Sequence, residues 1–254
     1  MTNQNRLIII GDIHGCISEF NALLEELRIT DTDQVFCIGD LIDRGPDSVS
    51  VVQRCVELTT VCDFKLILGN HEEKFLRYLN HLEKNTGLEN ELKGTHEFPL
   101  LIDRLHEKEI AFIKGAYFSY WLKQEKIMLL HGGISTNIQF PFPETYQYGV
   151  HSPKMFKGLD LVTKVRFLNP RGTFVSLHEE TEQDAYWAEV YEGAFGHIYF
   201  GHQPFLQETP KEFSHATGLD TGCVFGGWLS AVIIEHGTKR YVSVKAKEAY
   251  SIQH

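Results

Sequence analysis

The chain has 254 residues, of which 43% are hydrophobic and 12% aromatic, enough apolar material for one globular domain with a sizeable core. Lys and Arg number 24 against 34 Asp and Glu, and the formal charge of −10 argues against a broad surface for nucleic acid or anionic lipid. The five cysteines are odd in number and form no Cys-x-x-Cys pair, which argues against a disulfide framework or a zinc ribbon.

The N-terminal sequence and the length of the apolar runs indicate the cellular location of the protein. The N-terminus carries no basic region followed by an apolar one, and no apolar stretch reaches the ~18 residues of a membrane span. Together with reduced thiols, this predicts a cytoplasmic protein without a membrane partner. We expect a single domain over residues 1–254.

The first 70 residues alternate between strand and helix patterns. Short, β-branched apolar runs at residues 7–10, 35–38 and 64–68 are typical of strands buried on both faces of a parallel sheet. Apolar residues at helical spacing fill both intervals between these runs. The pattern predicts a β-α-β-α-β half.

The rest of the chain is less regular. Residues 80–114 are polar and weakly periodic, and we interpret them as a helical insertion. Residues 135–153 are rich in proline and aromatic residues, which predicts a loop. Further strands are predicted at residues 117–122, 126–130, 198–200, 229–235 and 240–244.

Polar residues stand at the carboxyl ends of several predicted strands. A Gly-Asp pair ends the first two, a Gly-Asn pair ends the third, and a histidine ends two later strands. Glycine permits a sharp turn, so the adjacent side chain points into the crevice at the sheet edge. One such end is usually a turn, but five are hard to explain as independent turns. The side chains predicted to converge are Asp12, Asp40, Asn70, His131 and His202.

This donor set predicts a metal centre. Oxygen and imidazole donors without thiolate suit Mn²⁺, Fe or Zn²⁺, and two ions can be held if one carboxylate bridges them. Paired cations serve in-line displacement at phosphorus, because they hold the phosphoryl oxygens and lower the pKa of a shared water until hydroxide forms near neutral pH. We expect two divalent ions, with Mn²⁺ preferred and Fe or Zn²⁺ as alternatives.

Two further side chains fit phosphoryl chemistry. The leaving oxygen needs a proton donor, and His71 lies beside Asn70 in position for that role. Arg44 offers a planar guanidinium that can clamp phosphate oxygens. Histidines outside such a context are interpreted as ordinary core or surface residues, namely His96, His106, His151, His178, His197, His215, His236 and His254.

Three sequence blocks carry a resemblance to a known family. Gly-Asp-x-His-Gly at residues 11–15, Gly-Asp-x-x-Asp-Arg-Gly at residues 39–45 and Gly-Asn-His-Glu at residues 69–72 occur in this order. They resemble the signature of the phosphoprotein phosphatase branch of the calcineurin-like metallophosphoesterases, in its bacterial form, and the match extends loosely over most of the chain. The resemblance implies an α/β fold in which a central β-sandwich is flanked by helices.

Carried over residue by residue, the resemblance also implies roles. The first metal would be held by Asp12, His14 and Asp40, and the second by Asp40, Asn70, His131 and His202. Asp43 would pair with His71 and tune it as the proton donor, while Arg44 would grip phosphate.

The family has a second phosphate-binding arginine whose local motif is not recognisable in this chain. Arg166 in Lys-Val-Arg-Phe and Arg171 in Asn-Pro-Arg-Gly are both candidates, and we favour Arg166. Residues 220–227 resemble a segment shared by bacterial members, and we expect it to pack a loop against the site rather than to supply chemistry.

The leading hypothesis is a serine/threonine protein phosphatase that acts on a phosphorylated protein or peptide through hydroxide held by the two ions. Symmetrical tetraphosphate hydrolases of the family usually carry alanine in place of Asp43. This chain keeps the aspartate and has Glu72 after the Asn-His pair, a combination that resembles the protein phosphatases more. The alternative is a dinucleoside polyphosphate hydrolase with a nucleotide phosphate substrate, such as diadenosine tetraphosphate. An inactive scaffold is a third reading, disfavoured by the complete ligand set. The sequence leaves open the metal in the cell, the physiological substrate, the oligomeric state and the role of residues 80–114.

Overall fold

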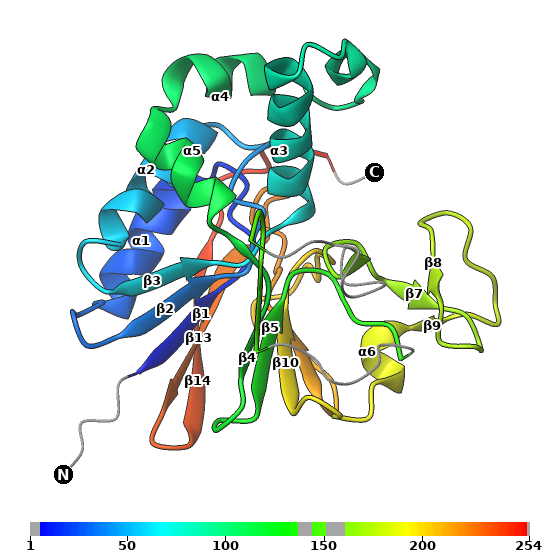
Figure 1. The fold of residues 1–254 in the computed structure, drawn as a ribbon. Coiled ribbons are helices and arrows are strands. Elements are labelled where there is room, and N and C mark those ends of the chain that lie inside the picture. Colours follow the sequence, from blue (N-terminus) through cyan, green and yellow to red (C-terminus); the bar gives the residue numbers. More distant parts are fainter. Residues whose placement is uncertain (1–5, 137–143, 151–160, 253–254) are drawn as a thin grey trace.

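The computed structural model describes residues 6–136, 144–150 and 161–252. Two β-sheets pack face to face, with helices on the outer side of one sheet and a small three-stranded sheet beyond the other (Figure 1). The α/β fold with a central β-sandwich flanked by helices, which the resemblance implied, is confirmed. In the part of the chain that is described, no helix is both long and apolar enough to cross a membrane.

The first sheet contains the predicted β-α-β-α-β half. Its strand order is β14-β13-β1-β2-β3, with β1, β2 and β3 parallel and the two C-terminal strands antiparallel. The strands are β1 (Leu7–Ile10), β2 (Gln34–Cys37), β3 (Asp63–Leu66), β13 (Trp228–Glu235) and β14 (Thr238–Lys245). The helices over its outer face are α1 (Ile17–Leu27), α2 (Ser48–Leu58) and α3 (Asn70–Glu83).

The second sheet has the order β11-β12-β10-β5-β4-β6, with β5, β10 and β12 parallel to one another. Its strands are β4 (Tyr117–Leu122), β5 (Ile127–Leu130), β6 (Thr145–Gln147), β10 (His197–Phe200), β11 (Lys211–Glu212) and β12 (Ala216–Gly218). Beyond it lie α6 (Trp187–Val190) and the small sheet of β7 (Phe167–Leu168), β8 (Phe174–Val175) and β9 (Ala185–Tyr186).

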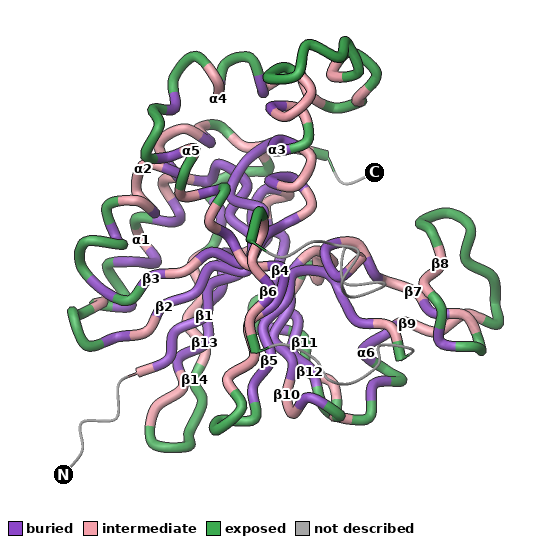
Figure 2. Tube along the Cα trace, in the orientation of Figure 1, coloured by how far each residue is buried: buried purple, intermediate pink, exposed green. Residues whose placement is uncertain are grey.

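The continuous apolar run of β1 is explained by burial on both faces. Leu7 and Ile9 point into the core between the two sheets, whereas Ile8 and Ile10 point into the core under the helices. Burying each of these side chains contributes roughly 1.5–3 kcal/mol. Figure 2 shows the inner strands of both sheets buried, with exposed residues at the β13–β14 turn and on the outer helix faces. The apolar residues of β1 therefore contribute to the core on both sides of the first sheet.

Three helical segments occupy the region predicted as a helical insertion. They are η1 (Leu88–Glu91), α4 (Phe98–Arg104) and α5 (Glu107–Lys114). Phe98 is fully buried, and its ring lies 5.3 Å from that of Phe75 and 5.5 Å from that of Tyr78, measured between centroids. Since both partners belong to α3, this contact anchors the start of α4 to the helix that follows β3.

The region predicted as loop at residues 135–153 differs in part. Residues 145–147 form β6, which pairs with β4 at the edge of the second sheet. This short strand escaped prediction because its pattern gains meaning only from the neighbour it pairs with. Part of the predicted loop, together with His151 and His254, lies outside the described residues.

Candidate metal centre

The predicted ligands meet at one end of the sandwich. Strands β1, β2 and β3 of the first sheet and β5 and β10 of the second each end there, because parallel strands present their carboxyl ends at the same edge. The side chains that follow these strands are Asp12, Asp40, Asn70, His131 and His202.

Asp40 is the hub of this cluster. Its Oδ2 lies 3.3 Å from Nε2 of His131, 3.4 Å from Nε2 of His14 and 3.9 Å from Nε2 of His71. All four side chains are buried. Asp40 therefore occupies the central position that a bridging carboxylate requires.

Asn70 joins the two histidines of the second sheet. Its Oδ1 lies 2.8 Å from Nδ1 of His202 and 3.1 Å from Nε2 of His131. The potential ligand atoms of Asp40, His131 and His202 lie within 4.8 Å of one another, and so do those of His14, Asp40 and His71. The first group fits the second metal that the resemblance implied. The other group places His71, expected as proton donor, as close to Asp40 as a ligand would be.

The protonation of the imidazoles fits cation binding. His14 Nδ1 donates to the carbonyl of Ile42 at 3.0 Å, and His131 Nδ1 donates to the carbonyl of Ile38 at 2.6 Å. These bonds turn the Nε2 atoms toward Asp40. Burial lowers the pKa of His14 to about 3, so its Nε2 presents a lone pair to a carboxylate oxygen. A cation between the two atoms would turn that repulsion into coordination.

An orphaned carboxylate oxygen supports the same conclusion. Oδ2 of Asp12 accepts from the backbone N–H of His202 at 2.9 Å, whereas the buried Oδ1 has no hydrogen-bond partner among the described residues. Burial, reinforced by the charges of Asp220 and Asp40, raises the pKa of Asp12 well above its ordinary value. An unpaired buried oxygen is costly, and a metal ion would satisfy it.

The charges around Asp40 show where positive charge is favoured. Burial opposes ionisation of Asp40, but the neighbouring His131 and His71 hold its pKa well below the ordinary value. Burial likewise works against a charged His131, yet Asp40 raises the pKa of that imidazole to about 10. In the absence of metal, protons take the place that cations would occupy.

Backbone strain is concentrated at this site. Among the described residues, ten non-glycine residues have positive φ, and five of them are His14 (47°), Asp40 (49°), Asp43 (75°), Arg44 (76°) and His202 (68°). Such conformations cost of order 1–3 kcal/mol each and persist where the surroundings enforce them.

Two glycines give the ligands room. A Cβ on Gly69 would lie 2.3 Å from Oδ1 of Asp40, and one on Gly201 would lie 2.0 Å from Oδ1 of Asp12. Both distances are far below van der Waals contact, so no larger residue fits these positions without displacing a ligand. Since neither glycine has a positive φ, close approach of the ligand, rather than the turn that the sequence suggested, requires glycine at these two positions.

Asp43 and His71 form the predicted pair. His71 Nδ1 donates to Oδ2 of Asp43 at 2.7 Å, and the ammonium of Lys74 lies 3.7 Å from the same oxygen. Burial opposes ionisation of Asp43, but the hydrogen bond from His71 outweighs it and lowers the pKa of Asp43 to about 2. The ionised carboxylate orients the imidazole with Nε2 toward Asp40.

The two candidate phosphate-binding arginines, Arg166 and Arg171, lie in different surroundings in the structure. Arg166 Nη2 donates to the carbonyl of His202 at 2.9 Å, so its guanidinium reaches the metal cluster. Arg171 is exposed in the turn between β7 and β8. Arg44 Nη1 donates to Nε2 of His14 at 3.0 Å, and its guanidinium lies 5.6 Å from the ring centre of Phe225.

Glu72 was used in the sequence analysis only as a family feature, and the structure gives it a physical role. Its fully buried carboxylate accepts backbone N–H groups from Gly69 (3.1 Å), Asp40 (2.8 Å), Leu41 (2.8 Å) and Ile42 (3.2 Å). It therefore holds the loop after β2 to the start of α3. A glutamate three residues after a helix N-cap is the sequence signal that could have indicated this role.

Two further side chains at the site were not predicted. Asp220 is buried, and burial raises its pKa to about 6. Oε2 of Glu97, at the start of α4, accepts from the backbone N–H of Asp43 at 3.0 Å and from Oγ of Ser48 at 2.9 Å. The helical insertion thus touches the loop that carries the Asp43 and Arg44 pair.

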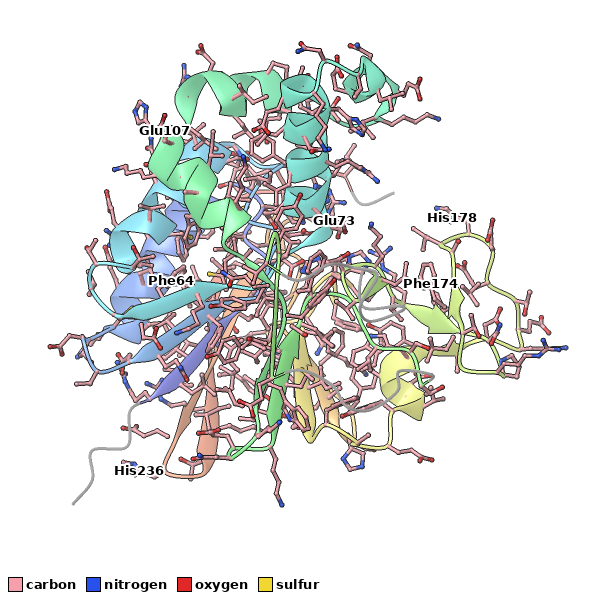
Figure 3. All side chains as sticks on the ribbon, viewed as in Figure 1. Phe64, Glu73, Glu107, Phe174, His178 and His236 are labelled. Atoms are coloured by element: carbon pink, nitrogen blue, oxygen red, sulfur yellow. The ribbon has the colours of Figure 1, made fainter. Side chains whose placement is uncertain are left out.

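Three of the other described histidines lie on the surface or within the second sheet. His178 and His236 are exposed on outer turns of the molecule (Figure 3). His197 hydrogen-bonds to Oγ1 of Thr217 at 2.8 Å between β10 and β12, which are neighbours in the second sheet. These positions agree with the interpretation of ordinary surface and core residues.

The sequence pattern of calcineurin-like phosphoesterases matches residues 5–206. The asymmetrical bis(5'-nucleosyl)-tetraphosphatase PrpE of Oceanobacillus iheyensis is 28% identical over 260 residues, spanning 96% of this chain and 94% of that protein. A symmetrical bis(5'-nucleosyl)-tetraphosphatase of Buchnera aphidicola is 26% identical over 265 residues, or 89% and 94% of the two chains. The crystal structure of a protein assigned as a diadenosine tetraphosphatase superposes with a TM-score of 0.70 at 25% identity, covering 96% and 95%.

These comparisons overturn the leading hypothesis of a serine/threonine protein phosphatase. The relatives that match nearly the whole chain carry tetraphosphatase names, which agrees with the alternative hypothesis instead. The physical reason is that the three motifs build the cluster of potential metal ligands and the Asp43 and His71 pair, all of which would act on a phosphoryl group. They would serve a phosphate monoester and a polyphosphate anhydride equally, so they carry no information on the rest of the substrate.

Proposed function

Because the chain belongs to the calcineurin-like phosphoesterase family, we propose that this metallophosphoesterase hydrolyses dinucleoside tetraphosphates, and that it cleaves them asymmetrically. The products would be a nucleoside triphosphate and a nucleoside monophosphate. The observation that carries the proposal is the full-length similarity to an enzyme named for this activity. The presence of Asp43, which symmetrical enzymes of the family usually replace by alanine, favours the asymmetrical reaction.

The residues present fit two divalent cations. We assign the first ion to Asp12, His14 and Asp40 and the second to Asp40, Asn70, His131 and His202, with Mn²⁺ as the expected metal. When bound, such ions neutralise phosphate oxygens and lower the pKa of the attacking water.

The protein side chains would complete the reaction. Water would lose a proton to bulk solvent and add its oxygen to phosphorus as the bond from phosphorus to the bridging oxygen breaks. Protonated His71 would give a proton to the departing phosphate oxygen and be reprotonated from solvent. Asp43 keeps the imidazole in orientation through its 2.7 Å hydrogen bond. A cation held by His14 would take the acceptor that Arg44 now uses, and Arg44 would then be free to contact the phosphate oxygens, with Arg166 as the second contact.

The proposal is tested by offering purified protein and Mn²⁺ either diadenosine tetraphosphate or a phosphoserine peptide. We expect the nucleotide to be preferred by at least ~100-fold in kcat/KM, equivalent to about 2.7 kcal/mol of transition-state binding. Anion-exchange chromatography of the products decides the mode of cleavage. Equal amounts of ATP and AMP support asymmetrical cleavage, whereas ADP alone contradicts it.

Two outcomes would overturn the function itself. Faster hydrolysis of the phosphopeptide would reject the nucleotide substrate. No activity on any phosphoester, together with no bound metal, would revive the inactive scaffold. The Asp40→Asn variant, prepared in parallel, controls for contaminating hydrolases because it removes the central ligand of the cluster.

A further inference from the structure

A second cluster of potential ligands lies behind the catalytic loops. It consists of Cys16, which immediately precedes α1, Glu19 in the first turn of α1, and Cys223 in the loop between β12 and β13. One ligand atom from each lies within 4.8 Å of the other two. Their relative exposures are 0%, 1% and 2%, so solvent does not reach them. The thiol of Cys16 donates to the carbonyl of His14 at 3.7 Å.

The carboxylate of Glu19 is incompletely satisfied. Oε1 accepts from the backbone N–H of Lys247 and from the hydroxyl of Tyr250, both at 2.9 Å. The buried Oε2 has no hydrogen-bond partner, and within the described part of the chain no lysine, arginine or histidine pairs with Glu19. A buried carboxylate with only neutral donors calls for a cation or a proton at its free oxygen.

The chemistry of this cluster differs from that of the catalytic centre. The catalytic ligands are oxygen and imidazole nitrogen, whereas here two sulfurs stand beside one carboxylate. Sulfur ligands favour Zn²⁺ and similar thiophilic ions over Mg²⁺, Ca²⁺ or Mn²⁺. We propose that Cys16, Glu19 and Cys223 bind one thiophilic divalent cation of the Zn²⁺ class, separate from the catalytic ions.

The three ligand atoms need to move only slightly closer together to bind a zinc ion. Zinc binds sulfur at about 2.3 Å and carboxylate oxygen at about 2.0–2.2 Å, so ligand atoms around it lie roughly 3.5–3.8 Å apart. Each thiol loses its proton to solvent as its bond to the metal forms. The carbonyl oxygen of His14, 3.7 Å from Sγ of Cys16, lies beside the set.

The position of the cluster predicts a structural role. Cys16 follows the loop that carries Asp12 and His14, and Cys223 belongs to the segment that places Phe225 beside Arg44. The C-terminal residues close over both, since Tyr250 donates its backbone N–H to the carbonyl of Val224 at 2.9 Å. A cation here would tie α1, this segment and the C-terminus together.

Cobalt provides the test, because thiolate ligands give an intense near-ultraviolet charge-transfer band that oxygen and imidazole ligands do not. Reduced wild-type protein is titrated with Co²⁺ alone. We expect the band to appear, to saturate within three equivalents of Co²⁺ per chain because the catalytic ligands take up two, to reach the intensity of one thiolate site per chain, and to be displaced by Zn²⁺. Cys16→Ser and Cys223→Ser should each lose most of it, and Glu19→Gln should weaken Co²⁺ affinity at least ~10-fold.

The chain offers a matched control. Cys37 and Cys55 are also buried free thiols, and among the described residues no carboxylate completes a ligand group with them. Cys55→Ser should therefore keep the full cobalt band, although it removes one buried thiol just as Cys16→Ser and Cys223→Ser do. Far-ultraviolet circular dichroism of every variant checks that the fold is retained.

The wild-type titration alone decides the matter if a variant does not fold. No thiolate band in the reduced protein would overturn the proposal, as would a band that persists in Cys223→Ser or disappears in Cys55→Ser. A disulfide between Cys16 and Cys223 that resists reductant would also overturn it. The site would bind its cation whatever the enzyme cleaves, so these results stay distinct from the substrate assay.

Discussion

The two sheets contribute to the catalytic metal centre in different ways. Ligands from the first sheet lie in loops that hold one another, as when Glu72 accepts the backbone N–H groups of Asp40, Leu41 and Ile42. The second sheet contributes two single histidines. Each is oriented by the first sheet, because His131 donates to the carbonyl of Ile38 and the N–H of His202 donates to Asp12. The loops of the first sheet therefore form a template, meaning that they hold their own ligands in place and orient the two histidines that the second sheet adds.

The largest effect should come from substitution of Asp40, the central ligand of the first sheet. Asp40→Asn removes the negative charge shared by both ions, so we expect both metals to be lost. Turnover should fall beyond the ~10⁴-fold limit expected for loss of a proton donor. Metal content by mass spectrometry checks this result. His202→Asn, from the second sheet, should lose only one ion; equal losses in both variants would contradict the distinction between template and completing ligands.

His71→Asn should separate chemistry from metal binding. The variant lacks the group that protonates the leaving oxygen, so kcat should fall by roughly 10²- to 10⁴-fold. Both metals should stay bound, because His71 is not assigned as a ligand. Loss of one metal in this variant would instead make His71 the ligand that its 3.9 Å approach to Asp40 permits.

A smaller effect on kcat/KM is expected when Arg166 and Arg171 are replaced. Arg166 reaches the cluster through the carbonyl of His202, whereas Arg171 lies in an exposed turn. Removing a charged hydrogen bond costs about 1.5–3 kcal/mol, so Arg166→Ala should lower kcat/KM by about 10- to 150-fold. Arg171→Ala should change it by less than about 2-fold, within the small range usual for exposed substitutions. The reverse order would exchange their assignments.

The smallest expected effect concerns stability and pH. The folded-state pKa of Asp43 is about 2, below its ordinary value of 3.8, so the ionised form stabilises the fold above pH 3.8. This contribution of about 2 kcal/mol is lost as the pH falls from 3.8 through 2. In metal-free protein, the stability difference between wild type and Asp43→Asn should therefore shrink over that range in urea unfolding. A constant difference would show that the pair is not ionised as described.

The difference between the two sheets also explains which parts of the site could be predicted from the sequence. Asp12, Asp40 and Asn70 could be placed together because each directly follows a strand of one parallel sheet, so local pattern and topology agree. The contact between Glu97 and Asp43 joins residues 54 positions apart and has no local signal. Arg166 was only one of two candidates, because its reach depends on how segment 161–168 packs near β10. Strands of two or three residues, such as β7 to β9, arise from pairing rather than from propensity.

The substrate hypothesis failed for a related reason. The motifs describe the atoms around phosphorus, and those atoms are alike in a phosphoserine and in a tetraphosphate. The expectation rested on Asp43 and Glu72, whose described contacts are to His71 and to the loop that carries Asp40. Specificity depends on surfaces that the local motifs do not encode.

The hydrogen bond from the backbone N–H of Asp43 to Glu97 links the helical insertion to the loop that carries the proposed partner of His71. Asp43 and Arg44 are held at φ of 75° and 76°, and Glu97 is one of the groups that enforce this arrangement from outside their own loop. Any molecule that bound α4 and drew its first turn away would relax that loop and misalign the proton donor. The outer face of α4 is thus a place from which turnover could be adjusted without touching the metals.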